Sequence, residues 1–265
     1  MKQMEGICKL CGKKTMLTYE HVPPESAFND IPVKEFPAEE YLKAVTGQDG
    51  RMPWDFDGLH GKINQKGEGG YYLCNQCNNN TGSWYIKEYV EIARIFHCII
   101  TSEKLTPGIN CTFNIKRMHP LRFFKAAMTL FCDIGNQCFG DDNLRNYLLQ
   151  KESTDFNTEK YYVTICMISP NMRRVNGYAA IGLDRYTVFV SELLCYPIGI
   201  SLYFDKPKEY TPPGLCINGF ANCKYDDECP VDFVGLPYYE INSILPGDYR
   251  QKTEFSRFEV KKDGK

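Results

Sequence analysis

The segment "YYLCNQCNNNTGSWY", residues 71–85, places two cysteines and four asparagines between aromatic residues. The run "GGYYLC" that leads into it, residues 69–74, is typical of a short apolar strand. From Ile86 to Ile99 apolar residues recur at helical spacing, which predicts a helix from about Asn78 to Ile100. Thiols and amides concentrated where a strand passes into a helix indicate a metal site rather than an ordinary core.

A second segment, "ICKLCGKKTMLTYEHVPP" at residues 7–24, carries a matching cysteine pair. Both pairs have two residues between the thiols, so one tight turn can present two sulfurs to one ion. A single pair of this spacing also fits redox motifs, but each pair here lies beside a predicted strand. We therefore expect a structural Zn²⁺ held by four thiolates, with four buried free thiols as the alternative: Cys8, Cys11, Cys74 and Cys77.

The other nine of the 13 cysteines show no such pairing. Cys216, Cys223 and Cys229 lie close together in the sequence, near the acidic residues 226–228. Their spacings are irregular for zinc, so ordinary loop or core thiols are the stronger interpretation and a second metal site the weaker one.

Composition narrows the class of protein. The 265 residues are 43% hydrophobic and 24% charged, which allows a sizeable core. The chain has no run of 18 apolar residues, so no membrane span is predicted. The N-terminus lacks the apolar stretch of a signal peptide, and we therefore expect a cytoplasmic protein. A net charge of −2 gives no bulk basicity for nucleic acid. A local basic patch, "NIKRMHPLRFFK" at 114–125, is either the solvated start of a helix or a surface that contacts the phosphates of a nucleic-acid backbone.

The pattern along the chain predicts an α+β protein in two parts. Residues 1–104 hold both cysteine pairs and a long insertion at about 23–68, which contains one short helix beginning near Pro37 and otherwise turns. Residues 105–265 begin with helices at 120–135 and at about 141–152, the second capped by an aspartate. From residue 160 onward they continue as β-strands, and no element is assigned after 205.

A zinc ion shared by both cysteine pairs would bring two polar groups together. Glu20 and His21 end the first strand, and Asn78 directly follows Cys77. Carboxylate and amide oxygens are ligands that Mg²⁺ accepts while it keeps several waters. An unperturbed histidine has a pKa of about 6.5, so a histidine beside the cation can take a proton from water at neutral pH. The three side chains around one open cation position predict a phosphodiester hydrolysis site, whereas an isolated Glu-His pair is usually an ordinary surface feature.

The pattern C-x2-C … EHVPP … C-x2-C-N-x3-G resembles the zinc-containing HNH endonucleases, the ββα-metal or His-Me finger group. Its layout is most similar to phage resolvases of the endonuclease VII type, and the resemblance covers about residues 7–95. It implies that His21 activates the attacking water as general base. It also implies that Glu20 and Asn78 hold a catalytic Mg²⁺ or Mn²⁺ ion, while the four cysteines hold structural zinc.

The resemblance has further implications and some departures. It implies a nucleic-acid substrate, DNA in the first place, and a homodimer, because the resolvases pair. Glu20 stands where the family usually has aspartate, and Gly82 where some relatives have another metal-binding histidine. The family's asparagine that braces the loop before the second strand has one candidate in "HGKINQKGEGG", Asn64.

Two alternatives remain open at this point. The first is a zinc-ribbon module that binds nucleic acid or protein without catalysis and uses 114–125 as its contact surface. The second is a regulated nuclease in which residues 105–265 sense a ligand or a protein activator, since nucleases of this type need far fewer residues.

Overall fold

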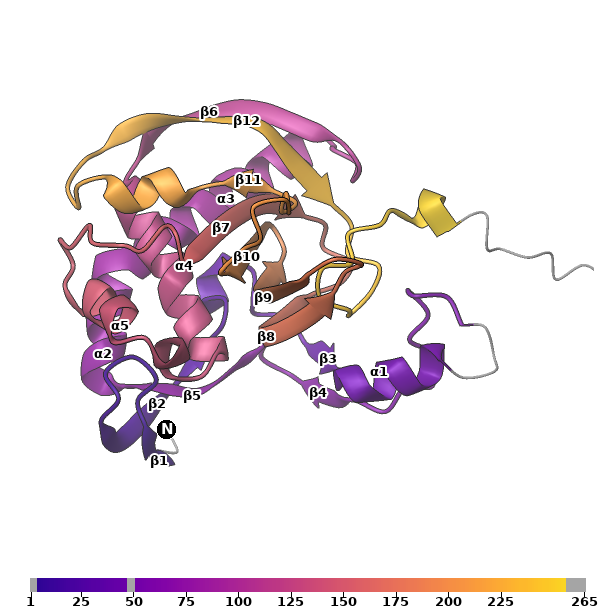
Figure 1. The fold of residues 1–265 in the computed structure, drawn as a ribbon, viewed down its shortest axis with the longest axis horizontal. Coiled ribbons are helices and arrows are strands. Elements are labelled where there is room, and N and C mark those ends of the chain that lie inside the picture. Colours follow the sequence, from indigo (N-terminus) through magenta and orange to yellow (C-terminus); the bar gives the residue numbers. More distant parts are fainter. Residues whose placement is uncertain (1–3, 47–50, 256–265) are drawn as a thin grey trace, which may run out of the picture.

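Two main sheets and a group of helices make up the part of the chain that this computed structural model describes, residues 4–46 and 51–255. The class is mixed α+β, as the sequence predicted. Figure 1 shows the small sheet at the bottom of the molecule, the long strands β6 and β12 at the top and the helix α4 between them.

The small sheet joins the two cysteine-bearing segments. It has the order β1 (Met4–Ile7), β2 (Lys14–His21) and β5 (Gly69–Cys74), and all its neighbours are antiparallel. The register sets Leu17 opposite Cys74 and His21 opposite Gly69. The N-terminal part of the chain thus brings the end of β2 next to the start of β5.

A continuous helical segment follows β5. It consists of α2 (Asn75–Thr81), a π-helical turn η2 (Gly82–Ile86) and α3 (Lys87–Ser102). The predicted helix start near Asn78 was three residues too late, because the Cys74 side chain caps α2 by accepting a hydrogen bond from the Cys77 N–H. A cysteine is not among the usual capping residues.

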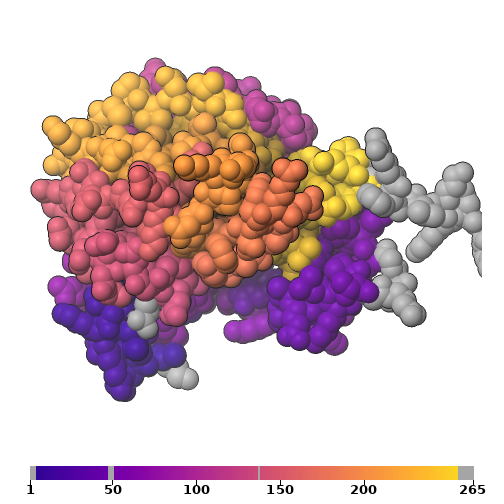
Figure 2. Space-filling view, viewed as in Figure 1, coloured from indigo at the N-terminus to yellow at the C-terminus, as the bar shows by residue number. Residues whose placement is uncertain are grey.

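Residues 33–46 and 51–64 of the insertion form a lobe of their own, drawn in purple at the lower right of Figure 2, while residues 25–27 pack against α3. The expectation that the insertion holds turns apart from one helix was wrong for Lys62–Asn64, which pair with a strand about 29 residues earlier in the chain. Its elements are η1 (Glu25–Ala27), β3 (Val33–Glu35), α1 (Ala38–Val45) and β4 (Lys62–Asn64).

The large sheet has seven strands and is mostly antiparallel. Its one parallel pair joins β12 and β7, with Tyr238 opposite Met167. The strands predicted after residue 160 are confirmed, and the segment left unassigned supplies β11 and β12. In spatial order the members are β6 (Asn110–Met118), β12 (Cys229–Tyr239), β7 (Tyr161–Ile168), β10 (Ile198–Phe204), β9 (Thr187–Cys195) and β8 (Arg174–Gly182), with β11 (Leu215–Cys216) beside β7.

The helix α4 (Pro120–Ile134) is buried along almost its whole length, so its apolar residues surround it instead of forming one stripe. It packs against α3 and against strands of the large sheet. The next helix, α5 (Asp142–Leu149), is capped by Asp141, whose carboxylate accepts from the backbone N–H groups of Asn143 and Leu144. The remaining short helical turns are η3 (Gln137–Gly140), η4 (Asn218–Asn222) and η5 (Lys252–Phe255).

One cluster of buried apolar side chains contains residues from both sides of the predicted boundary at 104–105. Phe96 of α3, for example, lies edge-on to Phe113 and Phe233, with ring centroids 5.5 and 5.6 Å apart. The division into domains 1–104 and 105–265 stays a prediction.

Candidate metal centre

The first cysteine pair sits in a tight turn between β1 and β2. Cys8 follows β1, and the backbone N–H of Gly12 donates to the Cys8 carbonyl over 2.8 Å. Gly12 has φ of 73°, a left-handed conformation that glycine adopts without strain. The turn is held on β5, because the Lys9 N–H donates to the Tyr72 carbonyl over 2.9 Å.

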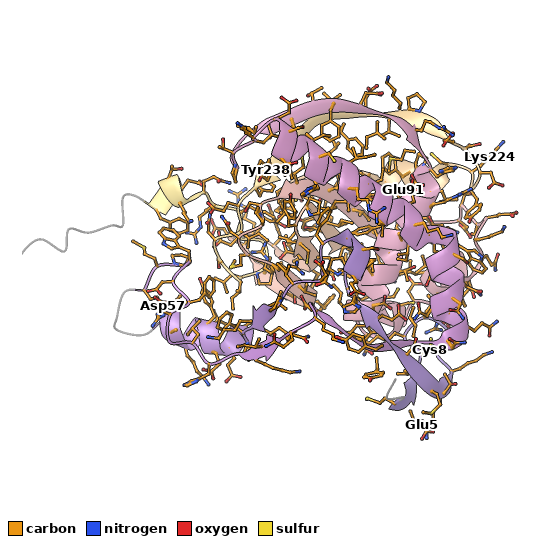
Figure 3. The ribbon with its side chains drawn as sticks, turned by 180° about the vertical axis from the view of Figure 1, so that it is seen from behind. Glu5, Cys8, Asp57, Glu91, Lys224 and Tyr238 are labelled. Atoms are coloured by element: carbon orange, nitrogen blue, oxygen red, sulfur yellow. The ribbon has the colours of Figure 1, made fainter. Side chains whose placement is uncertain are left out.

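The second pair lies at the junction of β5 and α2. Cys74 is the last residue of β5, and Cys77 lies in the first turn of α2. The backbone N–H of Cys74 donates to the Cys8 sulfur over 3.3 Å, which links the two pairs directly. Figure 3 shows Cys8 near the base of the small sheet, beside the start of the helical segment.

The four sulfurs gather in one place. The Sγ atoms of Cys8, Cys11, Cys74 and Cys77 all lie within 4.8 Å of one another, and those of Cys11 and Cys74 are 4.0 Å apart. A tetrahedral ion with Zn–S bonds of about 2.3 Å requires sulfurs about 3.8 Å apart. The donor set and its spacing therefore fit zinc, and this group can hold a metal ion.

The thiols influence one another's ionisation. A hydrogen bond from Cys77 stabilises the Cys8 thiolate and lowers the pKa of Cys8 to about 4, although burial opposes this fall. The same hydrogen bond and burial raise the pKa of Cys77. One thiolate is thus already favoured inside the cluster, as binding of a cation requires.

Glu20 and Asn78 both approach Thr18. The Asn78 Nδ2 donates to Thr18 Oγ1 over 3.0 Å, and Thr18 Oγ1 donates to the Leu73 carbonyl over 3.0 Å. Thr18 and Glu20 are two residues apart on β2 and share a face. Because Asn78 donates with Nδ2, its Oδ1 is the amide atom left for a cation. Glu20 and Asn78, the carboxylate and the amide predicted as ligands, thus both neighbour Thr18, and their joint binding of a cation stays a prediction.

His21 lies differently. Neighbouring residues of an extended strand point to opposite faces, so the His21 ring is on the face of β2 away from Glu20. It lies edge-on to Tyr19 with ring centroids 5.3 Å apart. Its Nε2 atom is buried without a hydrogen-bond partner among the described residues. The convergence of His21 with Glu20 and Asn78 on one cation stays a prediction.

A second carboxylate, Asp133 of α4, belongs to the same neighbourhood. Asp133 is 1% exposed, and its Oδ1 and the Glu20 Oε1 are both buried without hydrogen-bond partners in the described chain. Burial and then the Cys8 thiolate raise the pKa of Glu20 to about 8, against a hydrogen bond from Thr18. Burial and then the Glu20 charge raise the pKa of Asp133, against the charge of Lys9. Each of these carboxyl groups keeps one oxygen without a partner, and carboxylate oxygens are hard donors of the kind that Mg²⁺ binds.

The loop brace is Asn29, not Asn64. Asn29 is fully buried, and its side chain donates to the carbonyls of Pro23 and Glu68 over 2.6 and 2.8 Å. Its Oδ1 accepts from the Glu68 N–H over 2.9 Å. Gly67 passes so close that a Cβ there would lie 2.0 Å from the Asn29 carbonyl oxygen. Asn64 lies on β4, where its side chain donates to Glu35 over 3.1 Å.

The sequence held no clear signal for Asn29 or Asp133. Asn29 stands in a loop 39 residues before its partner Glu68, and Asp133 looks like the last polar residue of an apolar helix. Asn29 and Asp133 share one distinguishing feature: each polar side chain is fully buried although no neighbouring residue requires it. Burial is a property of the tertiary structure, so the sequence does not show it.

The basic patch at 114–125 is not a continuous cationic surface. Residues up to Met118 form β6 rather than the start of a helix. Lys125 is fully buried and donates to the carbonyls of Tyr147, Gln150 and Lys151 at the end of α5. Carboxylates pair with three other basic side chains, Arg117 with Glu228 (2.9 Å), Arg122 with Asp226 (2.8 Å) and His119 with Glu88 (3.1 Å), while Lys116 is exposed.

The weaker expectation of a second metal site is not supported. Within residues 4–46 and 51–255, the four-cysteine group is the one set of three or more His, Cys, Asp or Glu side chains close enough to share an ion. Cys216 is exposed, and Cys223 and Cys229 are half-buried. They behave as ordinary thiols of the loops and strands that carry them.

Comparison with known proteins adds no relative. The chain matches no protein-family model, no curated protein and no solved structure. Among the described residues, none of the helices combines the length and the apolar character that crossing a membrane requires.

Proposed function

We propose that the chain is a metal-dependent HNH endonuclease that hydrolyses phosphodiester bonds in DNA. The observation that carries the proposal is the junction of β2, β5 and α2. There the four-cysteine group lies beside Thr18, and Glu20 and Asn78 approach Thr18 from a strand and a helix. This junction of two strands and a helix supports the proposal, because the sequence resemblance implies such a junction beside a structural zinc site.

Two groups of side chains would bind metal ions in this proposal. Cys8, Cys11, Cys74 and Cys77 would hold Zn²⁺, which would fix the junction without taking part in the reaction. Glu20 and the Asn78 Oδ1 would hold Mg²⁺ or Mn²⁺, which stabilises negative charge on a phosphate when bound. Asp133, whose Oδ1 has no partner among the described residues, lies in the same region and would offer the cation a further oxygen.

His21 accepts a proton from the attacking water at Nε2, a buried atom that no described residue engages. His21 is the last residue of β2. A phosphodiester lying across the end of this strand can therefore meet the imidazole on one side and the Glu20–Asn78 pair on the other.

The test is plasmid cleavage in Mg²⁺ or Mn²⁺. We expect His21→Ala to lose about 10²–10⁴-fold in rate, the usual contribution of a positioned general base. His60→Ala is the matched control, since His60 is exposed on the insertion and should cut at the parent rate. Parent-like cleavage by His21→Ala, with the fold intact by circular dichroism, would disprove the assignment.

One observation favours a second function, a zinc-ribbon module that binds nucleic acid without cutting it. Glu20 and His21 lie on opposite faces of β2. A purely structural site tolerates this arrangement, whereas a catalytic site requires both side chains to reach the same phosphodiester. This alternative expects Glu20→Ala and Asn78→Ala to bind DNA as the parent does in a gel-shift assay. It also expects that no divalent ion besides zinc changes the binding.

A further inference from the structure

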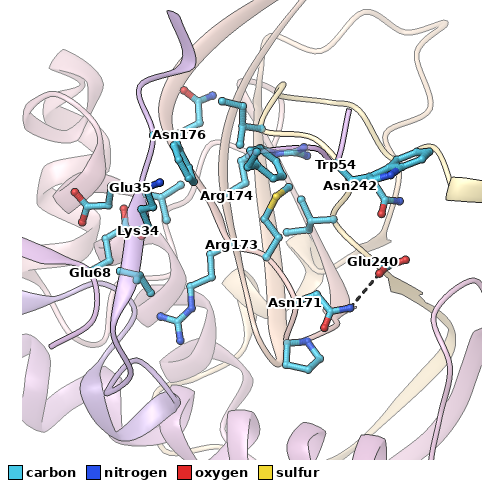
Figure 4. Close-up of a pocket in the computed structure, with 18 of the residues that line it drawn as sticks. Lys34, Glu35, Trp54, Glu68, Asn171, Arg173, Arg174, Asn176, Glu240 and Asn242 are labelled. Carbon is cyan, nitrogen blue, oxygen red and sulfur yellow. Dashed lines mark hydrogen bonds between the residues drawn. The ribbon is translucent and has the colours of Figure 1, made fainter. Parts of the chain in front are cut away.

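The strand β8 forms one edge of the large sheet, because β9 is its single pairing partner among the described strands. Its first residues, up to Asn176, line a cleft of about 540 Å³ between the insertion and the sheet (Figure 4). Beyond this cleft the pairing with β9 is irregular between Asn176 and Ala179. Irregularities of this kind re-aim side chains at the edges of sheets. Here the irregular segment presents Tyr178 to solvent.

Tyr178 and Phe189 are the two exposed aromatic side chains in the part of the chain that the structure describes, residues 4–46 and 51–255. Tyr178 is 55% exposed, and Phe189 of β9 is 37% exposed. Their rings stack, with centroids 5.8 Å apart and an interplanar angle of 19°. Phe204 of β10 is buried and lies edge-on to Tyr178, with centroids 5.1 Å apart. The sheet therefore fixes the Tyr178 ring from one side, and more than half of the residue stays open to solvent.

The surface around the two rings is narrow. Ala180, Gly182 and Thr187 share the face of the rings and are exposed, and they add little apolar area. Leu183, in the turn after β8, is the nearest exposed apolar residue along the strand. A stable protein interface buries about 800 Å² on each partner, whereas a nucleobase needs one open ring face. Stacking on aromatic side chains is a general way of holding unpaired bases, so the rings suit a base better than a folded partner.

The rings lie beside the end of α4, which carries a carboxylate of the proposed active site. Gly177 packs so closely on this end that a Cβ there would lie 2.3 Å from the Ile134 carbonyl oxygen. Asp133 directly precedes Ile134, and its carboxyl group feels the charge of Glu20. Figure 1 shows the lower end of α4 next to β8. A nucleotide stacked on Tyr178 therefore belongs to a strand that can continue past α4 toward the proposed cation site.

The edge of the sheet offers few phosphate contacts. Arg185, in the turn between β8 and β9, is exposed, but Asp184 beside it is exposed too and offsets its charge. Each phosphate contact steepens the fall of log K with log salt by about 0.7 for a single strand. Because the rings rather than cations would supply most of the binding, we expect a shallow salt dependence.

We propose that Tyr178 and Phe189 form a stacking platform for one unpaired base of the nucleic-acid substrate. The base stacks on the open side of Tyr178, and Phe189 supports the ring from the sheet. The inference rests on the proposed nuclease function and adds a substrate contact in the C-terminal part of the chain. The platform positions a strand and takes no part in bond cleavage.

Binding is measured without cleavage, with the His21→Ala protein and fluorescein-labelled oligothymidylate followed by fluorescence anisotropy. Tyr178→Phe keeps the ring and should bind as His21→Ala alone does. Tyr178→Leu keeps apolar surface without a ring and should bind at least about fivefold more weakly, and so should Phe189→Leu. A blunt duplex, whose bases are paired, should not distinguish Tyr178→Phe from Tyr178→Leu.

Photo-crosslinking locates the base on the protein. A 5-bromouracil in the oligothymidylate couples to an aromatic ring stacked on it under ultraviolet light, with loss of HBr. Mass spectrometry should place the new bond on Tyr178 or Phe189. Trp84 is the comparison, because it is half-buried on η2 beside the proposed active site and should not couple.

Three results would overturn the platform: no saturable binding of oligothymidylate, undiminished binding by Tyr178→Leu, or coupling at other residues only. A changed oligomeric state of Tyr178→Leu in light scattering, with unchanged DNA binding, would assign the rings to contact between copies of the chain and overturn it as well. The crosslink is measured without changing either ring, so it decides the question even if a leucine variant misfolds. Any of these results leaves the nuclease proposal standing, because that proposal depends on plasmid cleavage by the parent and by His21→Ala.

Discussion

Replacing Asn29 by alanine tests how the end of β2 is held. The side chain makes four hydrogen bonds: to the Pro23 carbonyl (2.6 Å), to the Glu68 carbonyl (2.8 Å), from the Glu68 N–H (2.9 Å) and from Arg173 Nη1 (2.5 Å). A typical net value of about 1 kcal/mol for each bond gives about 4 kcal/mol. The free energy of unfolding of a domain is about 5–15 kcal/mol, so the loss is a large part of the total.

The measurement is urea unfolding followed by circular dichroism. With a denaturant slope of about 1–3 kcal/mol per molar urea, the midpoint of Asn29→Ala should fall by about 1 to 4 M. Asn64→Ala is the matched control. Asn64 is half-buried and its side chain makes one hydrogen bond, to Glu35 over 3.1 Å, so its loss should stay below about 1 kcal/mol.

The two variants also test whether Asn29 or Asn64 braces the loop before β5. Asn29 connects the Pro23 carbonyl, just after His21, to the residue that precedes Gly69 of β5. Asn29→Ala should therefore reduce DNA cleavage as well as stability at a temperature where the protein stays folded. If Asn29→Ala and Asn64→Ala unfold at the same urea concentration, the reasoning from burial and bond number is refuted.

Three further predictions concern the four-cysteine group and the helices α4 and α5. Cys74→Ser should lower the zinc content from one ion per chain when measured by mass spectrometry of metals, whereas Cys98→Ser, at an exposed and isolated thiol, should not. Lys125→Met should cost about 2–4 kcal/mol in thermal unfolding, because three carbonyl acceptors lose their donor, and Lys116→Met on the surface should cost almost nothing. Burial alone would raise the pKa of Asp141, but hydrogen bonds from Lys160 and Tyr161 lower it to about 2 from 3.8. Its stabilisation of about 1–2 kcal/mol is therefore present above pH 4 and lost as the pH falls toward 2, and Asp141→Asn should flatten that part of the stability curve; an unchanged acid slope would contradict it.

Local patterns were enough to place much of the fold. Alternation and helical spacing predicted β2, β5, α4 and the strands after residue 160, and an aspartate before α5 predicted its cap. These features depend on a few neighbouring residues, so the chain carries their signal locally. The strand β4 was missed because its three residues have no alternation of their own and pair only with β3.

The candidate site likewise has some features that the local sequence predicts and others that it does not. The spacing within each cysteine pair is a property of one turn, and the two pairs lie on strands that the pattern predicted, so the four-thiol group followed from the residues alone. The strand period placed Thr18 and Glu20 on one face of β2, and the expectation of an ion shared by both cysteine pairs placed Asn78 near that strand, where it donates to Thr18.

The sequence therefore determined the cysteine cluster and the strands and helix that carry it, because short-range spacing and periodicity encode both. Tertiary structure alone decided that Asn29 braces the loop, that Asp133 joins Glu20, and that Lys125 lies in the core. Each of these outcomes depends on the burial of a polar group against partners distant in the chain, such as Glu68 for Asn29 and Glu20 for Asp133. Such energies belong to the packed arrangement, and no run of neighbouring residues records them.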